Sequence, residues 1–460
     1  MKLPAYPRTK PSGGEWLGDV PEHWESKRFG YLFRFYSGGT PSTSESDLWD
    51  GELPWVSSKD MKSMVIADTE DHISEAAVRQ SATCKLPAGS LLIVNRSGIL
   101  KHSIPAAIIT REMAINQDIR GCVPLSAVDS KFIAYLIVGN QPALLALWRQ
   151  QGATVESLTF ESVKTTNLHL PNLAEQRAIA LFLDRETGRV DRLVAKKREL
   201  IERLKEKRTA LISRTVTRGL PPAAARAAGL PANPPLKPSG VPWFDEYPRH
   251  WQTKRLRHIS DIIVVGVVVN PSSYVTDEGV VFLLGGDVRE MRIDTTDCKR
   301  CSPESSNGAL VKSRLDAGDL VVVRVGYPGV AAVVPPELAG GNVASMMLVR
   351  RHPRYCSQWL AYAFNSQVGR DQVEIVQYGA AQKQFNISHA VDFAFPFPPL
   401  PEQTAIAAYL DEKTAKLDAL VGKVAEAVER LQEYRTALIT AAVTGKIDVR
   451  PAKRVTSASP

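Results

Sequence analysis

The residues best suited to chemistry in this sequence are basic and polar side chains that fall in expected loops. Arg, Asn and Gln can form paired hydrogen bonds with the edges of DNA bases, whereas Lys, Ser, Thr and backbone amides bind phosphates. In the first half these candidates are Gly38, Thr40, Ser57, Lys59, Asn95, Arg96, Lys101, His102, Asn116 and Gln117. In the second half they are Lys312, Arg314, Arg324, Tyr327, Asn342, Gln382, Lys383 and Asn386. Each residue alone is explained equally well as an ordinary loop residue, but their occurrence in both halves favours contact with DNA.

The sequence lacks the residue patterns of the common catalytic and cofactor sites. It has no Gly-x-x-x-x-Gly-Lys-Ser/Thr phosphate loop, no Gly-x-Gly-x-x-Gly after a strand, no His-Glu-x-x-His and no Gly-x-Ser-x-Gly. Cys298 and Cys301 form one Cys-x-x-Cys, but a structural zinc site needs a second ligand pair. We therefore expect no catalytic residue, no bound metal and no cofactor in this chain.

Length and composition indicate a folded protein with more than one domain. The chain has 460 residues, of which 44% are hydrophobic and 23% charged, and a single core rarely grows past about 250 to 300 residues. The formal net charge of +8 permits a polyanionic partner without requiring one. The longest apolar stretch, residues 262–269, is too short to span a membrane, and residues 1–11 have no signal-peptide core. We expect a cytoplasmic protein with no membrane contact.

The chain is a tandem repeat in which matched segments lie 237 − 10 = 227 positions apart. The matched pairs are Lys10–Gly13 with Lys237–Gly240, His23-Trp24 with His250-Trp251, Glu175-Gln176 with Glu402-Gln403, and Arg208–Ile212 with Arg435–Ile439. Between these segments, residues 28–168 and 255–395 have diverged while keeping nearly the same length. The Pro/Ala-rich segment 219–238 between the repeats predicts an extended, semi-rigid linker. The repeated histidines His23 and His250 are best explained by packing or by a hydrogen bond to the backbone.

Each repeat ends in a segment that predicts a long amphipathic helix. Residues 174–217 contain no proline and carry apolar residues at alternating spacings of three and four, which is typical of a coiled-coil seam. The predicted seam is Ile179, Leu183, Glu186, Val190, Leu193, Lys197, Leu200, Leu204, Lys207 and Leu211. In the second helix it is Ile406, Leu410, Lys413, Leu417, Leu420, Val424, Ala427, Leu431, Tyr434 and Leu438. The two helices are expected to pair as an antiparallel coiled coil with pseudo-two-fold symmetry; the alternative is that each packs on its own domain.

The diverged inserts predict mixed α/β domains, so the expected fold class is α+β. Apolar, β-branched runs bounded by turn residues predict strands. These runs are 91–94, 106–109, 279–284, 320–323 and 330–334, with helical stretches near 131–151 and 358–378. Residues 87–98 resemble residues 316–326: in each, a strand leads directly into a glycine-containing loop that carries an arginine. Such loops on a rigid scaffold are where variable recognition usually occurs.

These repeated signatures resemble the DNA specificity subunit of type I restriction-modification enzymes. Each half opens with Ser-Gly-x-x-Trp and Pro-x-His-Trp, and each helix opens with Leu-Pro-x-x-x-Glu-Gln-x-Ala-Ile-Ala or a close variant. The resemblance extends over residues 12–447, and the combination of both duplicated signatures is specific. It implies a noncatalytic subunit in which the two inserts are target recognition domains, each reading one half of an asymmetric bipartite DNA sequence.

The resemblance also implies a domain division and a set of partners. The division is 1–27 for an N-terminal opening segment, 28–168 for target recognition domain 1, 169–218 for spacer helix 1, 219–239 for the linker, 240–395 for target recognition domain 2 with its opening segment, 396–447 for spacer helix 2, and 448–460 for a tail. The helices would set the gap between half-sites and dock two methylation subunits. The expected docking residues are Glu175, Gln176, Ile179, Leu183, Glu402, Gln403, Ile406 and Leu410.

Double-stranded DNA, two methylation subunits and a restriction/translocase subunit are thus the expected partners. S-adenosylmethionine, ATP and magnesium would enter with those subunits. The alternative is a noncatalytic helical scaffold or adaptor that does not read DNA sequence. The halves also differ. Where the first insert has Gly38–Pro41, the second has Val264–Pro271, and Asn116-Gln117 has only an approximate counterpart at Gly341-Asn342.

Overall fold

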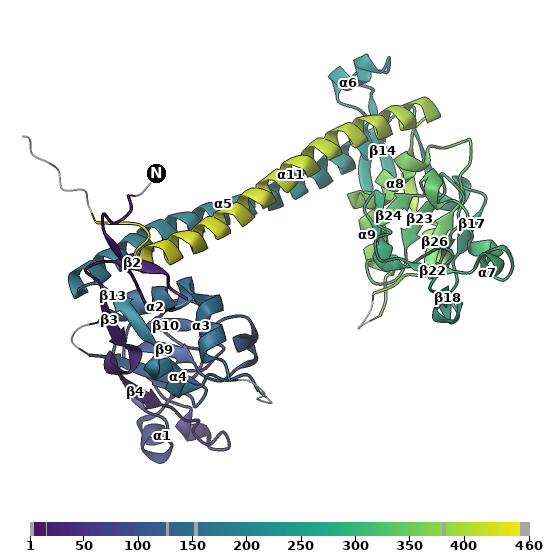
Figure 1. Ribbon diagram of the computed structural model, residues 1–460. Coiled ribbons are helices and arrows are strands. Elements are labelled where there is room, and N and C mark those ends of the chain that lie inside the picture. The colour runs from purple at the N-terminus through teal and green to yellow at the C-terminus, as the bar shows by residue number, and fades with distance from the viewer. Residues whose placement is uncertain (1–3, 15, 126–127, 151–154, 380–382, 451–460) are drawn as a thin grey trace, which may run out of the picture. The chain divides into compact units, whose positions relative to one another are not determined.

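The computed structural model describes residues 4–14, 16–125, 128–150, 155–379 and 383–450. It divides into two compact units: unit 1 comprises residues 1–197 and 426–460, and unit 2 comprises residues 198–425. Each unit is mixed α/β (Figure 1). The long helices α5 (Leu173–Arg218) and α11 (Leu400–Val443) contribute residues to both units.

Unit 1 is built on a five-stranded and a four-stranded sheet, with orders β4-β12-β9-β10-β6 and β7-β5-β11-β8. Two small antiparallel pairs, β1-β2 and β3-β13, flank them. Its strands are β1 (Thr9–Pro11), β2 (Asp19–Pro21), β3 (Glu25–Arg28), β4 (Phe33–Ser37), β5 (Leu53–Val56), β6 (Val65–Ile66), β7 (His72–Ile73), β8 (Lys85–Leu86), β9 (Leu91–Val94), β10 (Ala106–Ile109), β11 (Met113–Ile115), β12 (Ile119–Pro124) and β13 (Asn167–Leu170). Its short helices are α1 (Glu75–Gln80), α2 (Ser130–Gly139), α3 (Gln141–Trp148) and α4 (Phe160–Thr165).

Unit 2 repeats this plan with the sheets β17-β26-β23-β24 and β18-β22-β19-β25. Its strands are β14 (Leu236–Val241), β15 (Phe244–Pro248), β16 (Gln252–Arg255), β17 (Ile263–Val265), β18 (Val275–Thr276), β19 (Val280–Leu283), β20 (Val288–Arg289), β21 (Arg292–Ile293), β22 (Lys299–Cys301), β23 (Leu320–Val323), β24 (Ala331–Val333), β25 (Asn342–Val343), β26 (Met346–Val349) and β27 (Ala394–Phe397). Its short helices are α6 (Pro222–Ala227), α7 (Pro303–Asn307), α8 (Ser357–Asn365), α9 (Gln367–Val376) and α10 (Ile387–Ala390).

The predicted strands are present, and the central ones are buried on both faces. β9 and β23 are composed of β-branched and leucine residues, all of them buried. The two predicted helical stretches differ from expectation because each is broken into two helices. Asn140 separates α2 from α3, and Ser366 separates α8 from α9, each with non-helical backbone angles. Proline at the start of α3 supplies no amide hydrogen, which favours a new helix at that point.

The linker prediction is wrong for part of its length, because residues 222–227 form helix α6 instead of an extended segment. Proline in the first turn and the alanines that follow are both favourable in helices. Ala225 is buried, and its carbonyl accepts a hydrogen bond from the Leu230 amide at 2.8 Å. The linker therefore packs on unit 2 before it continues into β14.

The two long helices pack side by side and antiparallel. In unit 1, Val190 and Val194 of α5 form a buried cluster with Val428 of α11. Asp191 of α5 pairs with Arg435 at 2.9 Å, so earlier residues of α5 meet later residues of α11. The repeat-related pair in unit 2, Arg208 with Asp418, has a separation of 3.1 Å. The coiled-coil prediction is confirmed.

The predicted seam is wrong at several positions along both helices. Leu193, Leu200, Leu420 and Tyr434 are 41%, 42%, 44% and 52% exposed. The seam instead contains the next residues along the chain, which are buried or half-buried: Thr187, Val194, Ile201 and Arg208 in α5, and Thr414, Val421, Val428 and Arg435 in α11. Polar residues can occupy it because the Thr187 hydroxyl donates to the Leu183 carbonyl at 2.6 Å and the arginines pair with aspartates of the facing helix.

No single helix among the described residues is long and apolar enough to cross a membrane. The adjacent helices α2 and α3 pass this test only when taken together, and they are bent by 91° at their junction.

The seam assignment predicts opposite outcomes for two neighbouring substitutions. Val194→Asp places a carboxylate in the cluster with Val428 and should lower the free energy of unfolding by about 2 kcal/mol or more. Leu193→Asp, at an exposed position of the same helix turn, should change it by less than about 0.5 kcal/mol. Thermal unfolding followed by circular dichroism measures both. Equal destabilisation by the two variants would contradict the observed seam.

Candidate nucleic-acid interface

Several loops of unit 1 meet at one edge of its sheets. Ser37 at the end of β4 pairs with Arg120, and Val94 at the end of β9 pairs with Ile119, so these strand ends lie at the same edge. Ile115 of β11 pairs with Val56 of β5, which brings the loop after β5 there as well. We call the loops 38–42, 57–60, 95–105, 116–118 and 156–158 the loop edge of unit 1.

The candidate residues of the first half gather at this edge. The Thr40 hydroxyl donates to Gln117 Oε1 at 2.6 Å, and the backbone N–H of Asn95 donates to the Asp118 carbonyl at 2.7 Å. Arg96 is exposed, and its Nε donates to Asp118 Oδ1 at 2.8 Å. Hydrogen bonds thus connect loops that are far apart in the sequence. The structure brings these residues together as predicted, but their contact with DNA stays a prediction.

Charge at this edge is partly neutralised by nearby carboxylates. Lys59 Nζ lies 2.9 Å from Asp71 and 3.2 Å from Glu70, and the hydrogen bond that Lys59 donates to Asp71 contributes most to holding the pKa of Lys59 above its usual value. Ser57 donates to Asp60 at 2.9 Å. Lys101 and His102 are exposed in the loop between β9 and β10. A phosphate would have to compete with Asp71 for Lys59.

The opposite edge of the unit 1 sheets leads to the long helices. The Leu125 amide donates to the Leu32 carbonyl at 2.9 Å, next to the start of β4 and the end of β12. A few residues later, the Asp129 amide donates to Gln176 Oε1 of α5 at 2.9 Å. The loop edge is therefore the free edge of the domain, on the side away from its helical support (Figure 1).

Unit 2 has a loop edge in the equivalent position. Val323 at the end of β23 pairs with Met346, and Val265 at the end of β17 pairs with Met347. The Gly326 amide donates to the Lys383 carbonyl at 2.9 Å, and the Ala344 amide donates to the Leu283 carbonyl at 2.9 Å. We call the loops 266–270, 284–287, 324–330, 344–345 and 383–386 the loop edge of unit 2.

The structure supports part of the second candidate set by position. Arg324, Tyr327, Lys383 and Asn386 lie at the loop edge. Tyr327 is 74% exposed, whereas Arg324 is 9% exposed and donates from Nε to the Phe385 carbonyl at 3.1 Å. Arg324 therefore holds two loops together within the domain. Gln382 lies outside the described residues.

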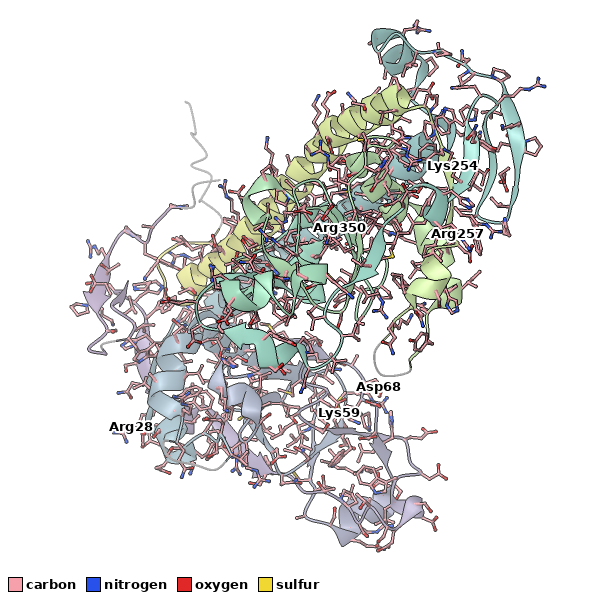
Figure 2. The ribbon with its side chains drawn as sticks, turned by 90° about the vertical axis from the view of Figure 1, so that its right-hand side faces the viewer. Arg28, Lys59, Asp68, Lys254, Arg257 and Arg350 are labelled. Carbon is pink, nitrogen blue, oxygen red and sulfur yellow. The ribbon has the colours of Figure 1, made fainter. Side chains whose placement is uncertain are left out.

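Three other candidates of the second half are elsewhere. Asn342 is fully buried, and its Nδ2 donates to the Leu310 carbonyl at 2.8 Å and to Ser313 at 3.0 Å, so its assignment to DNA binding is wrong. Lys312 and Arg314 are exposed at the opposite edge, where Arg350, labelled in Figure 2, donates to both their carbonyls. Arg350 also pairs with Asp319 at 2.6 Å and fixes this corner.

The sheet register corrects the correspondence between the two inserts. Ile115 pairs with Val56, and Val343 pairs with Leu283 in the same parallel arrangement. The counterpart of Asn116 is therefore Ala344, and the counterpart of Asn342 is the buried Ala114. Asn342 lies two residues before Ala344, so it resembles Asn116 in residue type but not in position in the sheet.

Two glycines align Gly38–Pro41 residue by residue with part of Val264–Pro271. An added Cβ at Gly38 would lie 2.0 Å from the Ile115 carbonyl oxygen, and one at Gly266 would lie 2.3 Å from the Val343 carbonyl oxygen. Both positions require glycine because a neighbouring backbone passes too closely for a side chain. The segment after Gly266, which was not among the candidates, thus occupies the place of Gly39–Ser42. Counting from the glycine aligns Thr40 with Val268.

The predicted docking residues are buried inside their own units. Exposure is 6% for Glu175 and 8% for Glu402, and at most 1% for Gln176, Ile179, Leu183, Gln403, Ile406 and Leu410. A partner subunit cannot reach such side chains without opening the domain, so their assignment to a partner surface is wrong for this conformation. The repeated Glu-Gln signature has another role, which its hydrogen bonds identify.

Each glutamate joins the opening segment of its half to the first turn of a long helix. Glu175 Oε2 lies 2.9 Å from His23 Nε2, and Glu175 Oε1 accepts from Tyr6 at 2.7 Å and from Trp24 Nε1 at 3.3 Å. A carboxylate in the first turn also suits the positive end of the helix dipole. The hydrogen bond that these histidines were expected to make is present, although its acceptor is a carboxylate.

Unit 2 repeats this arrangement. Glu402 lies 2.9 Å from His250 Nε2 and accepts from Trp251 Nε1. The following glutamines act alike: Gln176 Nε2 donates to the Pro171 carbonyl at 2.9 Å, and Gln403 Nε2 donates to the Pro398 carbonyl at 2.8 Å. The Cys356 amide donates to Gln403 Oε1 at 2.9 Å. The Glu-Gln pair therefore connects the opening segment, the insert and the helix in each half.

A second repeated contact lies about two turns further along each helix. The Tyr135 hydroxyl donates to Asp184 at 2.9 Å, and the Tyr362 hydroxyl donates to Asp411 at 2.7 Å. Burial raises the pKa of Tyr135 to about 12 and raises the pKa of Tyr362 as well, so both remain protonated donors. These tyrosines attach α2 and α8 to the long helices.

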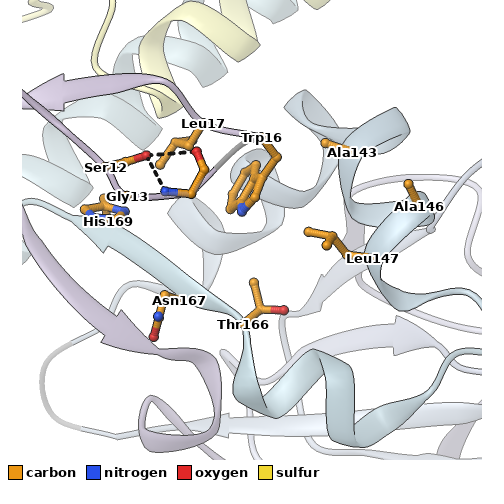
Figure 3. Close-up of a pocket in the computed structure, with 11 residues that line it drawn as sticks. Ser12, Gly13, Trp16, Leu17, Ala143, Ala146, Leu147, Thr166, Asn167 and His169 are labelled. Carbon is orange, nitrogen blue, oxygen red and sulfur yellow. Dashed lines mark hydrogen bonds between the residues drawn. The ribbon is translucent and has the colours of Figure 1, made fainter.

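Unit 1 also has an open pocket of about 530 Å³ outside the loop edge (Figure 3). It lies between the opening segment at Ser12–Leu17, helix α3 and strand β13. His169 lines it and is 7% exposed, and its Nδ1 has no hydrogen-bond partner. Burial lowers the pKa of His169, and this lower pKa favours the neutral form of the ring. Within the described ranges, no group of three or more His, Cys, Asp or Glu residues is placed to hold a metal ion.

Comparison with known proteins identifies the domain that carries the first loop edge. Residues 21–203 match the family model described as the type I restriction modification DNA specificity domain. The resemblance inferred from the repeated signatures is confirmed, and the matched specificity domain contains the loop edge of unit 1 and the first 31 residues of α5 (203 − 173 + 1).

Individual relatives agree with this specificity domain. The specificity subunit of the type I restriction enzyme EcoR124I/EcoR124II from Escherichia coli is 34% identical over 162 residues. That match covers 35% of this chain and 40% of the relative, so it spans less than half of either protein.

Two solved structures share the fold over almost the whole chain. One, described as the structural basis of complex assembly and conformational transition of the type I R-M system, has a TM-score of 0.69 with 17% identity and covers 93% of this chain and 99% of that chain. The HsdS subunit from Thermoanaerobacter tengcongensis has a TM-score of 0.52, also with 17% identity, and covers 93% and 98%. The likeness extends beyond the specificity domain to unit 2.

The buried glutamate predicts a large effect from one substitution and a small effect from its matched control. Glu402→Ala leaves Trp251 Nε1 and His250 without their acceptor and should lower the free energy of unfolding by about 2 to 3 kcal/mol. Glu412→Ala, on the same helix, removes only exposed pairs with Lys413 and Lys416 and should leave the stability almost unchanged. Urea unfolding compares the two. A Glu402→Ala variant as stable as Glu412→Ala would refute this role.

Proposed function

We propose that this chain is the DNA specificity subunit of a type I restriction-modification complex, in which each insert reads one half of an asymmetric bipartite target. The observation that carries the proposal is that two copies of one scaffold each bring loops of different composition to an equivalent edge of their own unit. The specificity-domain match over residues 21–203 supports the same conclusion. A subunit of this kind performs no catalysis itself and would act in the cytoplasm, where the DNA is.

In this proposal the paired helices set the number of base pairs between the half-sites and help to bind two methylation subunits. Exposed apolar residues such as Leu193 and Leu420, which the seam leaves uncovered, are better candidates for that contact than the buried Glu-Gln signature. The methylation subunits would supply S-adenosylmethionine, and a restriction/translocase subunit would use ATP and magnesium. No cofactor is proposed for this chain.

The first test is a methylome of a host that lacks its own modification systems. The gene is expressed with its neighbouring methylation subunit, and modified bases are compared with those of a host carrying the methylation subunit alone. A new bipartite adenine-methylation motif that requires this chain is the expected result. Sequence-independent DNA binding, or association of the proteins with no motif, would favour the scaffold alternative.

Two exposed lysines at opposite edges of unit 2 can test which edge contacts DNA. Lys383 lies at the loop edge and Lys312 at the opposite edge, and both are exposed. If Lys383 contacts a phosphate, Lys383→Ala should weaken binding to all sequences and reduce the slope of log affinity against log salt by about 1. Lys312→Ala should leave the slope unchanged. The measurement is a salt titration of DNA binding, and a reversed ranking of the variants would place DNA on the other edge.

A further inference from the structure

The loop edge of unit 2 carries an exposed apolar segment that its own domain does not cover. Val268 is 57% exposed and Val269 is 83% exposed. They follow Gly266 and precede Asn270, which has a left-handed φ of 48°. Exposed valines next to each other in a loop need an explanation, because the other exposed side chains at this edge, Tyr327, Lys383 and Asn386, carry polar groups.

Hydrogen bonds anchor the segment to the sheet immediately before the two valines. The Gly266 amide donates to the Met346 carbonyl at 2.9 Å, and the Val267 amide donates to the Val343 carbonyl at 3.0 Å. The Ser345 amide donates to the Val267 carbonyl at 2.8 Å, with Ser345 at a φ of 54°. Val267 itself packs against a core cluster that includes Phe282 and Ala344. Val268 and Val269 therefore follow directly after an anchored residue, and β-branched side chains have little rotamer freedom to lose on binding.

The equivalent place in unit 1 has the opposite chemical character. Counting from the matched glycines, Val268 replaces Thr40, which in unit 1 hydrogen-bonds Gln117. The register of the sheets puts Ser345 where unit 1 has Gln117. The hydrogen-bonded pair of Thr40 and Gln117 is thus replaced by an exposed valine beside a serine.

We propose that Val268 and Val269 contact the C5-methyl group of a thymine in the half-site read by unit 2. In the major groove the thymine methyl is the apolar feature of the base edges, and apolar side chains recognise it by contact. The inference rests on the proposed function, because it assumes that the loop edge of unit 2 faces DNA. It names the chemical feature that this loop selects.

The test removes only the methyl group. Once the methylome has given the motif, each thymine of the unit 2 half-site is replaced in turn by deoxyuridine, and affinity is measured by fluorescence anisotropy for the full-length chain purified with its methylation subunit. One substitution should weaken binding by about three- to fivefold, the factor expected for one buried methyl group. Replacement of both valines by serine, Val268→Ser with Val269→Ser, removes their methyl groups and should abolish the discrimination between thymine and deoxyuridine at that position.

The controls separate the two levels of inference. Val311→Ser, at a valine that is 52% exposed in the turn that contains Lys312, should keep the discrimination. Val268 and Val269 are exposed, so serine should not disturb the core, and the deoxyuridine series on the unaltered protein tests the proposal even if the variant is unstable. Sequence-specific binding that is insensitive to every deoxyuridine, or a unit 2 half-site without thymine, would overturn the valine contact and leave the proposed function intact. Loss of sequence-specific binding altogether would overturn both.

Discussion

A buried carboxylate in the first turn of each long helix is the interaction on which the rest of the architecture depends. Glu175 and Glu402 accept N–H groups from a histidine and a tryptophan that lie about 150 residues earlier in the chain. Burying a carboxylate is costly unless donors surround it, and here the donors come from the opening segment of the same half. The diverged insert begins and ends within this closed frame. Its composition can therefore change without altering how it is joined to the helix.

This frame explains how the two units can differ so much in their loops and so little in their strand order. The opposite edge of each sheet system is tied to the helix by the glutamine after each glutamate, through the amides of Asp129 and Cys356. The described residues of each loop edge make no such hydrogen bond to the long helices. Polar loops in unit 1 and a partly apolar surface in unit 2 are both compatible with the scaffold, because neither takes part in closing it.

The coiled-coil seam illustrates how a sequence pattern can be ambiguous. Leu193 and Val194 are both apolar, as are Leu200 and Ile201, so two overlapping stripes fit the spacing equally well. The predicted stripe contains Leu193 and Leu200. The stripe that is buried in the structure is the other one, in which Thr187 donates to a carbonyl of its own helix and Arg208 and Arg435 form ion pairs with aspartates of the facing helix. The spacing of apolar residues alone does not reveal these interactions of the polar residues.

The sequence by itself determined the duplication, the two long helices and the central strands, because these depend on repeats and on local apolar patterns. It also located the first candidate set, since strands that end at one edge bring their following loops together. Only the tertiary structure decided which polar residues are free. Asn342 and Arg324 have the residue types of base-reading side chains, yet the first is buried and the second bonds a neighbouring loop. Whether a polar group faces solvent or the core depends on strand register, and register is set by contacts between segments distant in the chain, which a local pattern does not contain.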